Sequence, residues 1–183
     1  MMPGRKAVFL DIDGTLLWNG EEPPCAADIA ALRQARAQGH YVFINTGRAQ
    51  GFLPRVLLHA DYLDGFLCGC GTQFIQNGKT VFGACMEEAC LHAVIRFFLE
   101  RPQRGCVLEA EDGSYSVGHE RAGCVPVMSV RETDGLRVTK ATVFSPLNRE
   151  EKDFLAPWFD LISMPRWYEA VLHGNGKLSL IHI

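Results

Sequence analysis

No run of five or more like charges occurs in this sequence, and its formal net charge is only −3 over 183 residues. A chain without a strongly charged stretch has no electrostatic footprint for a nucleic acid or for an anionic membrane surface. The sequence also lacks any stretch of roughly 18 uninterrupted apolar residues, the length that a membrane-spanning helix needs. These absences favour a small ligand, and we expect neither a nucleic-acid partner nor a membrane partner.

A cleavable leader is not predicted either. The apolar run near the N-terminus is interrupted by Asp11 and Asp13 after only a few residues, which makes it too short for the apolar region of a signal peptide. We therefore expect a cytoplasmic protein.

The seven cysteines do not form a metal-binding pattern. Cys68 and Cys70 are separated by one residue, whereas zinc knuckles and thioredoxin motifs have two, and no second Cys/His pair follows at finger-like spacing. We predict that most of the cysteines are small buried apolar residues.

Strand and helix patterns alternate in the first part of the chain. Residues 6–12 form a short apolar run that ends in acid, which predicts a fully buried strand opening onto a polar crevice. Residues 24–38 start with Pro and carry apolar residues at helical spacing, which predicts a helix. A second strand is predicted at 41–45 and a second helix at 49–59. This order predicts an α/β fold with a parallel sheet.

The pattern changes after these elements. Short β-like segments flank Asn77 and Gly78, a strong signal for a tight hairpin. The later predicted elements are a helix at 86–100, strands at 106–109, 114–117 and 138–144, and a helix at 149–156. Helices combined with antiparallel strands predict an α+β cap over residues 83–165. The cap is then inserted between a first core segment, 1–82, and a return to the core at 166–183.

Two carboxylates follow the first predicted strand at a chemically useful spacing. An aspartate attacks phosphorus when the repulsion between anions is cancelled by a divalent cation, and a second acid nearby protonates the leaving alkoxide. Asp11 and Asp13 fit these two roles. Gly14 allows a tight turn beside the ligand, and Thr15 offers a hydroxyl near the phosphate or fixes the turn.

A calcium-binding loop is the alternative interpretation of this segment, since Asp11, Asp13 and Glu22 match its first, third and twelfth positions. It fails because Leu16 stands at the sixth position, where the sharp turn needs Gly, and because a strand pattern precedes the loop.

A second polar group follows the predicted strand at 41–45. Thr46 and Gly47 precede a helical stretch, and a hydroxyl with backbone N–H groups at a helix start is a favourable place for phosphoryl oxygens. Alone, this pattern is more often a helix cap than a ligand site. Arg48 either reaches the phosphate or is a solvated helix residue, and the sequence leaves both readings open.

The segment from Phe9 to Leu17 resembles the first signature motif of the haloacid dehalogenase superfamily. The resemblance implies a Rossmann-like core, with Asp11 as nucleophile, Asp13 as acid/base, and Mg²⁺ held by the Asp11 carboxylate and the Asp13 backbone carbonyl. The segment around Thr46 resembles the second motif. The long insertion is similar to the cap of the Cof-like branch, whose members mostly act on sugar phosphates and other small phosphometabolites.

The later motifs match less completely. The loop that ends at Lys177 resembles the third motif, which implies that the ammonium of Lys177 screens the charge between nucleophile and phosphoryl group. The segment from Cys68 to Thr72 departs from the Asn-Gly-Ala-like stretch of the branch, which leaves the substrate open. The six residues after Lys177 contain no carboxylate, so the acid of the fourth motif is missing and we expect a truncated C-terminus, with an incomplete core and an exposed sheet edge.

The predicted function is a magnesium-dependent phosphatase that acts on a small phosphorylated metabolite through an aspartyl-phosphate on Asp11. Two alternatives stand beside it. The missing acid favours a catalytically impaired protein that binds a phosphorylated ligand, and a phosphomutase would use the same nucleophile. The sequence does not indicate an oligomeric state.

Overall fold

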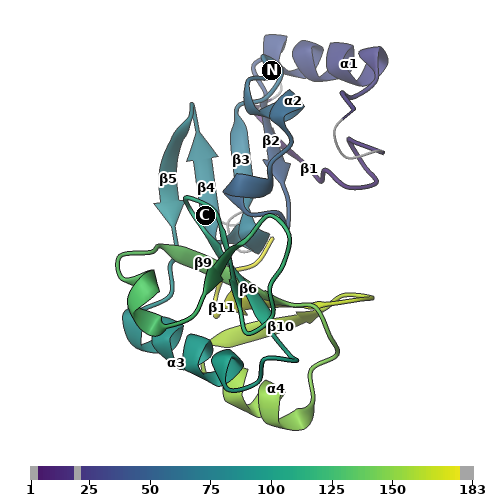
Figure 1. The fold of residues 1–183 in the computed structure, drawn as a ribbon. Coiled ribbons are helices and arrows are strands. Elements are labelled where there is room, and N and C mark those ends of the chain that lie inside the picture. Colours follow the sequence, from purple (N-terminus) through teal and green to yellow (C-terminus); the bar gives the residue numbers. More distant parts are fainter. Residues whose placement is uncertain (1–3, 19–21, 178–183) are drawn as a thin grey trace.

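The computed structural model describes residues 4–18 and 22–177, and within them it contains two β-sheets that lie one above the other in Figure 1. In spatial order, the core sheet contains β1 (Ala7–Leu10), β2 (Tyr41–Asn45), β3 (Gly65–Cys68), β4 (Gln73–Gln76) and β5 (Lys79–Gly83). In spatial order, the cap sheet contains β10 (Phe159–Ser163), β11 (Tyr168–Leu172), β9 (Val138–Val143), β6 (Cys106–Ala110), β7 (Ser114–Val117) and β8 (Val125–Val127). The chain therefore divides into a core part and a cap part.

The core sheet is parallel where helices connect its strands and antiparallel where hairpins do. β1, β2 and β3 are parallel neighbours, and α1 (Ala26–Ala37) forms the crossover between the first two. β4 and β5 extend the sheet antiparallel, joined by the turn at Asn77 and Gly78, both of which have positive φ. The predicted α/β fold is confirmed.

The helix predicted at 49–59 is replaced by two shorter helices, η1 (Gln50–Phe52) and α2 (Arg55–Leu58). Pro54 separates them, because proline disfavours the helical conformation in the residue before it, and Leu53 is indeed extended at φ −67° and ψ 133°. A third short helix, η2 (Gly69–Gly71), follows β3.

The first strand is less buried than its apolar sequence predicts. Every residue of β1 is exposed or intermediate, whereas four of the five residues of β2 are buried. The reason is that β1 lies at the end of the core sheet as described, so one of its sides has no neighbouring strand.

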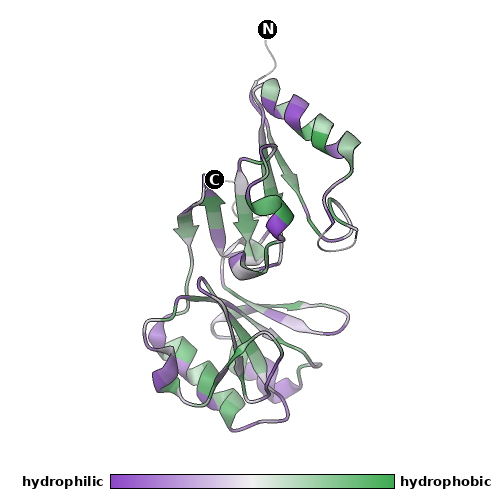
Figure 2. Ribbon diagram, turned by 45° about the horizontal axis from the view of Figure 1, so that its top comes forward, coloured by the Kyte–Doolittle hydropathy of each residue, from purple (hydrophilic) through white to green (hydrophobic). Residues whose placement is uncertain are grey.

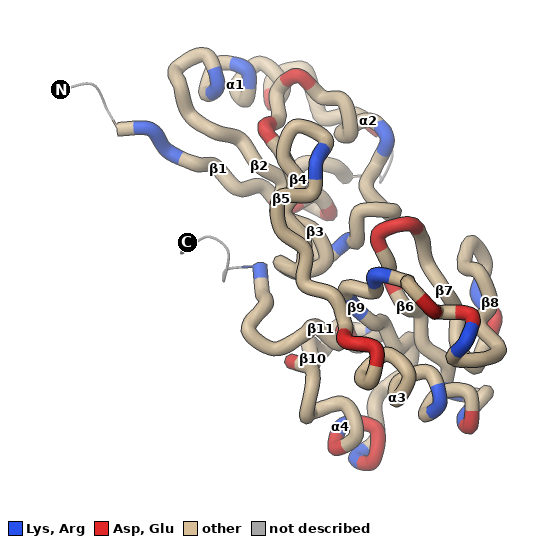
Figure 3. Tube along the Cα trace, turned by 90° about the vertical axis from the view of Figure 1, so that its left-hand side faces the viewer, with Lys and Arg blue, Asp and Glu red and all other residues tan. Residues whose placement is uncertain are grey.

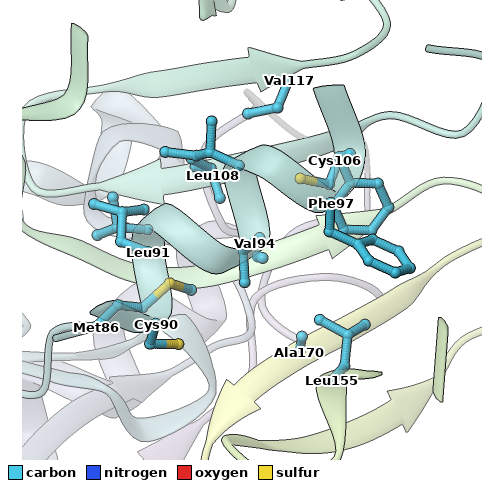
Figure 4. Close-up of a cluster of buried hydrophobic side chains, with 14 of the residues drawn as sticks. Met86, Cys90, Leu91, Val94, Phe97, Cys106, Leu108, Val117, Leu155 and Ala170 are labelled. Atoms are coloured by element: carbon cyan, nitrogen blue, oxygen red, sulfur yellow. The ribbon is translucent and has the colours of Figure 1, made fainter. Parts of the chain in front are cut away.

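The cap packs its helices on one face of its sheet. α3 (Glu88–Leu99) and α4 (Arg149–Leu155) lie on the side of the cap sheet away from the core sheet, and η3 (Val130–Thr133) lies near β8 (Figure 1). Figure 4 shows Leu91 and Val94 of α3 among the buried side chains of the strands, including Leu108 and Val117. This apolar cluster holds the cap together.

The return to the core predicted at residue 166 is wrong for β11. This strand pairs antiparallel with β9 and β10 in the cap sheet, and Ala170 is buried in the apolar cluster of the cap. β10, a strand that was not predicted from the sequence, is the antiparallel neighbour of β11 on the side away from β9. The cap sheet therefore extends to Leu172.

Strand alternation gives the cap sheet an apolar face and a polar face. Leu108, Ala141 and Ala170 point into the apolar cluster, so their chain neighbours Glu109 and Lys140 point to the opposite face. Figure 2 shows this mixture of hydrophobic and hydrophilic residues along the cap strands. The polar face is the one turned toward the core.

Charges of both signs lie interspersed along the trace in Figure 3. Within the described part of the chain, no helix combines the length and the apolar character that crossing a membrane requires.

Candidate active site

Two carboxylates lie in the loop where β1 ends. Asp11 and Asp13 flank Ile12, whose side chain is fully buried and anchors the backbone between them. The turn closes through the N–H of Leu17, which donates to the Ile12 carbonyl at 2.9 Å, and Gly14 adopts a φ of 73° that favours glycine. The Asp11 and Asp13 side chains remain 41% and 58% exposed, so both are open to a ligand.

Arg48 forms a bidentate ion pair with Asp13. Its Nε and Nη2 donate to the two carboxylate oxygens at 3.0 and 2.7 Å, and Nη1 donates to the Phe52 carbonyl at 3.1 Å. The hydrogen bond from Arg48 is the main reason that the pKa of Asp13 lies below its ordinary value. The sequence left Arg48 either as a phosphate ligand or as a solvated helix residue. In the structure its side chain lies in the lining of the cleft, paired with Asp13.

Lys177 reaches Asp11 from far along the chain. Its Nζ donates to Asp11 Oδ1 at 3.0 Å, while its backbone carbonyl accepts a hydrogen bond from Asn45 Nδ2 at 2.7 Å. The loop before it passes so close to the core that a Cβ on Gly71 would lie 2.3 Å from the Gly176 carbonyl oxygen. The second motif and the end of the described chain are thus fixed to each other.

Thr46 and Gly47 form the loop between the two carboxylates and the cap. Thr46 is buried, its N–H donates to the Leu67 carbonyl at 2.9 Å, and its Oγ1 accepts from the N–H of Arg48 at 3.1 Å. A Cβ on Gly47 would meet Cys70 Sγ at 3.4 Å. The same Cβ would lie 3.5 Å from the Glu169 carboxylate of the cap, an ordinary contact distance, so Gly47 lies where the cap and the core meet.

Gly14 and Thr15, unlike the other predicted site residues, do not line the cleft between cap and core. Both are exposed in the turn. The Thr15 N–H donates to the Ile12 carbonyl at 3.3 Å, a backbone bond of the turn that does not involve the Thr15 hydroxyl.

A buried polar cluster closes the cap side of the site, and the sequence did not reveal it. We define the cap cluster as Glu109, Lys140, Thr142 and Glu169 of the cap together with Cys70 of the core. The Lys140 ammonium lies 3.2 Å from Glu109 and 3.5 Å from Glu169, and it donates to the Gly47 carbonyl at 2.8 Å. Cys70 Sγ donates to Glu169 at 2.7 Å, and Thr142 Oγ1 donates to Glu109 at 2.6 Å. Two of these bonds join the cap directly to the core.

Burial and the charges of the cap cluster together determine two pKa shifts. Burial alone would lower the pKa of Lys140, but the carboxylates of Glu109 and Glu169 outweigh burial and raise it. Burial, followed by the charge of Glu169, raises the pKa of Cys70 to about 12. Lys140 is therefore a cation and Cys70 a neutral thiol near pH 7.

One cleft between the two parts of the chain is lined by the cap cluster and by the groups described above other than Gly14 and Thr15. Its volume is about 1050 Å³. The lining residues are Asp11, Asp13, Thr46, Gly47, Arg48, Phe52, Cys70, Glu109, Lys140, Thr142, Phe144, Ile162, Met164, Trp167, Glu169, Gly176 and Lys177. Six of the predicted site residues therefore meet in one place.

The oxygen donors at the mouth of the cleft fit Mg²⁺. This ion is typically held by one or two carboxylates and completes its octahedron with water and substrate phosphate. Between residues 4–18 and 22–177, no group of three or more His, Cys, Asp or Glu is arranged to hold a metal. The Asp11 carboxylate, 41% exposed and open to the cleft, is one such donor, and the Asp13 carbonyl stays the second predicted ligand. The predicted absence of a fourth-motif acid concerns residues after Lys177, which lie outside the described part.

Residues 8–153 match the family model described as haloacid dehalogenase-like hydrolase. The chain belongs to this family. A relative in Bacillus subtilis (strain 168), named "Putative phosphatase YkrA", is 25% identical over 186 residues, which cover 94% of this chain and 70% of the relative. The family predicted from the first and second motifs is confirmed.

Solved structures share the fold of this haloacid dehalogenase-like hydrolase. The subclass IIB sugar phosphatase BT4131 superposes with a TM-score of 0.74 at 20% identity, covering 98% of this chain and 74% of that one. BT1666 from Bacteroides thetaiotaomicron gives a TM-score of 0.76 at 18% identity, covering 97% and 70%. The arrangement of core and cap is therefore shared with phosphatases of known structure.

Proposed function

We propose that this haloacid dehalogenase-like hydrolase is a magnesium-dependent phosphatase that hydrolyses small phosphate monoesters through an aspartyl-phosphate on Asp11. Its partner is a small phosphorylated metabolite that enters the cleft between core and cap. The position of Asp11 carries the proposal, because its carboxylate is open to the cleft while one oxygen is held 3.0 Å from the Lys177 ammonium. The relative named as a phosphatase supports it.

The first step is attack of an Asp11 carboxylate oxygen on phosphorus. A new oxygen–phosphorus bond forms, the bond to the leaving alcohol breaks, and Asp13 donates the proton that the leaving alkoxide needs. The Thr46 hydroxyl and the Lys177 ammonium bind the phosphoryl oxygens. Lys177 also reduces the repulsion between nucleophile and phosphate.

The second step releases phosphate. Asp13, now ionised, removes a proton from water as the water attacks the aspartyl-phosphate, which restores the Asp11 carboxylate. When Mg²⁺ is bound by Asp11 and the Asp13 carbonyl, it neutralises charge on the phosphoryl group.

Arg48 adjusts the protonation of Asp13 during this cycle. In the free protein its two hydrogen bonds favour the ionised form of Asp13. A phosphate dianion competes for the same guanidinium, which weakens the pair and allows Asp13 to take up the proton that the first step consumes.

The test is phosphate release from a small monoester, with and without Mg²⁺, by the wild-type chain and by Asp11→Asn. Phosphatase activity that requires Mg²⁺ and falls at least about a thousandfold in Asp11→Asn is expected. Asp153→Asn, at an exposed carboxylate of α4, is the matched control and should retain activity. Acid-quenched wild-type enzyme should carry a phosphoryl group on the peptide that contains Asp11.

Three results would contradict the proposal. Full activity in Asp11→Asn would exclude Asp11 as the nucleophile. Binding of phosphate esters without turnover would favour the ligand-binding alternative. Transfer of the phosphoryl group to a second hydroxyl, with a bisphosphate intermediate, would identify a phosphomutase.

A further inference from the structure

The outer wall of the cleft consists of exposed apolar side chains. Phe52 comes from the core, Phe144 follows β9, and Ile162, Met164 and Trp167 belong to the β10–β11 hairpin. Four of them, Phe52, Phe144, Ile162 and Met164, are 37% to 45% exposed although they line a concave surface. In Figure 1 this hairpin extends outward from the cap sheet. Exposed apolar groups that converge in a cleft mark a site for an apolar part of a ligand.

This apolar wall begins directly beside the phosphate-binding groups. The carbonyl of Phe52 accepts a hydrogen bond from Arg48, which is paired with Asp13. A phosphate held at Asp11 and Arg48 therefore places the rest of the ester against Phe52 and the facing residues of the cap. The wall is the surface that the leaving group meets.

The polar groups deeper in the cleft are already paired with one another. Lys140 and Thr142 are hydrogen-bonded to Glu109, while Cys70 and Trp167 Nε1 donate to Glu169. A polyhydroxylated leaving group would have to break these bonds in order to replace its own hydrogen bonds to water. An apolar leaving group has no hydrogen bonds to water to replace, so it can bind while these pairs stay intact.

Two aromatic rings of the wall are held in place before any ligand binds. The Arg121 guanidinium lies 3.3 Å from the centroid of the Phe144 ring and covers one of its faces. The Phe144 and Trp167 rings lie 6.4 Å apart at 44°, and Trp167 is fixed through its hydrogen bond to Glu169. Rigid rings of this kind favour a flat ligand that stacks against them.

We propose that the substrate is a phosphate monoester whose leaving group carries a flat aromatic ring, bound by Phe144, Trp167 and Met164. This inference rests on the proposed phosphatase function and adds the class of leaving group to it. The aromatic ring packs against the wall while the phosphate reaches Asp11.

The test compares esters of similar chemical reactivity. 2-Phenylethyl phosphate, 2-cyclohexylethyl phosphate and ribose 5-phosphate are all esters of primary alcohols, so differences in kcat/KM report recognition of the leaving group rather than its basicity. The phenylethyl ester is expected to be preferred over ribose 5-phosphate by about a hundredfold and over the cyclohexyl ester by about fivefold. Calorimetric binding of 3-phenylpropylphosphonate and of a polyhydroxylated phosphonate measures the same preference without turnover.

A matched pair of variants locates the effect in the wall. Phe144→Gln should reduce the preference for the phenylethyl ester by about tenfold. Phe82→Gln changes a side chain that is also 40% exposed but lies outside the cleft, and it should leave the preference unchanged. Equal losses in the two variants would overturn the proposal.

The outcomes separate this inference from the proposed function. Hydrolysis with equal or greater efficiency toward ribose 5-phosphate would overturn the aromatic leaving group and leave the phosphatase standing. Equal efficiency toward the cyclohexyl ester would also overturn it, because the wall would then recognise apolar bulk alone. Preferential binding of the phenyl phosphonate without hydrolysis of any ester would support the inference and overturn the phosphatase. Absence of phosphonate binding would overturn the inference.

Discussion

Lys140 of the cap donates a hydrogen bond of 2.8 Å to the carbonyl of Gly47 in the core. The acceptor belongs to the peptide unit that joins Gly47 to Arg48, and Arg48 and the preceding Thr46 both line the phosphate-binding end of the cleft. The same ammonium is held by Glu109 and Glu169 on the cap sheet. The cap is therefore attached to the core at the loop that is proposed to bind the phosphoryl group.

Replacing Lys140 should destabilise the protein strongly. Lys140→Met leaves the buried carboxylates of Glu109 and Glu169 without their cation, and breaking a buried ion pair in this way costs about 3 kcal/mol. Urea unfolding measures the loss. Lys79→Met, at an exposed lysine of β5, should change the unfolding free energy by less than about 0.5 kcal/mol. Similar losses for both variants would show that the cluster contributes no particular stability.

The stability that Lys140 contributes should also depend on pH. Because the folded protein raises the pKa of Lys140 above 10.5, the contribution is fully present below pH 10.5 and is lost as pH rises through the folded-state pKa. The difference in unfolding free energy between wild type and Lys140→Met should therefore shrink above this pH. A difference that stays constant into strongly alkaline solution would contradict the shift.

Substitution of Gly71 should reduce activity by moving Lys177. A Cβ at this position would lie 2.3 Å from the Gly176 carbonyl oxygen, so Gly71→Ala should push the loop away and lengthen the contact between Lys177 and Asp11. Gly78→Ala is the matched control, because Gly78 also has positive φ but a Cβ there meets nothing within 4 Å.

Thermal unfolding and phosphatase kinetics separate the two effects. Each variant should lose about 1 kcal/mol of stability from the left-handed backbone. Only Gly71→Ala should lower kcat, by about tenfold or more, since a displacement of 1 Å at a reacting group can cost about a hundredfold. Unchanged kcat in Gly71→Ala would mean that the position of Lys177 does not limit the reaction.

The sequence predicted those site residues whose position follows from local structure. Asp11 and Thr46 come directly after β1 and β2, and Asp13 follows Asp11 by two residues. Neighbouring parallel strands bring their carboxyl ends to the same sheet edge. Lys177 was found through a family resemblance rather than from the residues around it. Its contact with Asp11 spans 166 positions, a separation that no local pattern encodes.

The cap cluster was missed because strand register creates it. Glu109 faces Lys140 across β6 and β9, and Glu169 faces Thr142 across β11 and β9. Each of these residues looks like an ordinary polar position of a strand when read alone. The available signal was a charged residue within an otherwise apolar or β-branched run, as at Lys140, which indicates a buried partner. The sequence alone does not give the order in which the strands pair, so it could not identify Glu109 and Glu169 as the partners of Lys140.

Arg48 should control the pH dependence of the reaction. Its pair with Asp13 lowers the pKa of the acid that protonates the leaving alkoxide, and in kcat/KM the active form of Asp13 is the protonated one. Arg48→Gln should therefore move the descending alkaline limb of the kcat/KM profile to higher pH when an alkyl phosphate is the substrate. Arg55→Gln, at an exposed arginine of α2, should leave the limb in place. A limb that moves to lower pH in Arg48→Gln would exclude Asp13 as the acid.

Cys70 should report whether the cap is attached to the core. Its thiol is buried, donates to Glu169 and has a pKa raised to about 12, so alkylation by iodoacetamide at pH 8 should be slow, because only the thiolate reacts. Exposed Cys25 should be labelled first.

Glu169→Gln removes the charge that helps to raise the pKa of Cys70, and it weakens the attachment between cap and core. The substitution should therefore accelerate labelling of Cys70, which peptide mass spectrometry measures. Cys106 lies in the apolar cluster of the cap, away from the cleft, and its labelling should not change. If Cys70 and Cys106 were labelled faster to the same degree, the substitution would have loosened the cap as a whole, and the bond between Cys70 and Glu169 would have no separate role in closing the cleft.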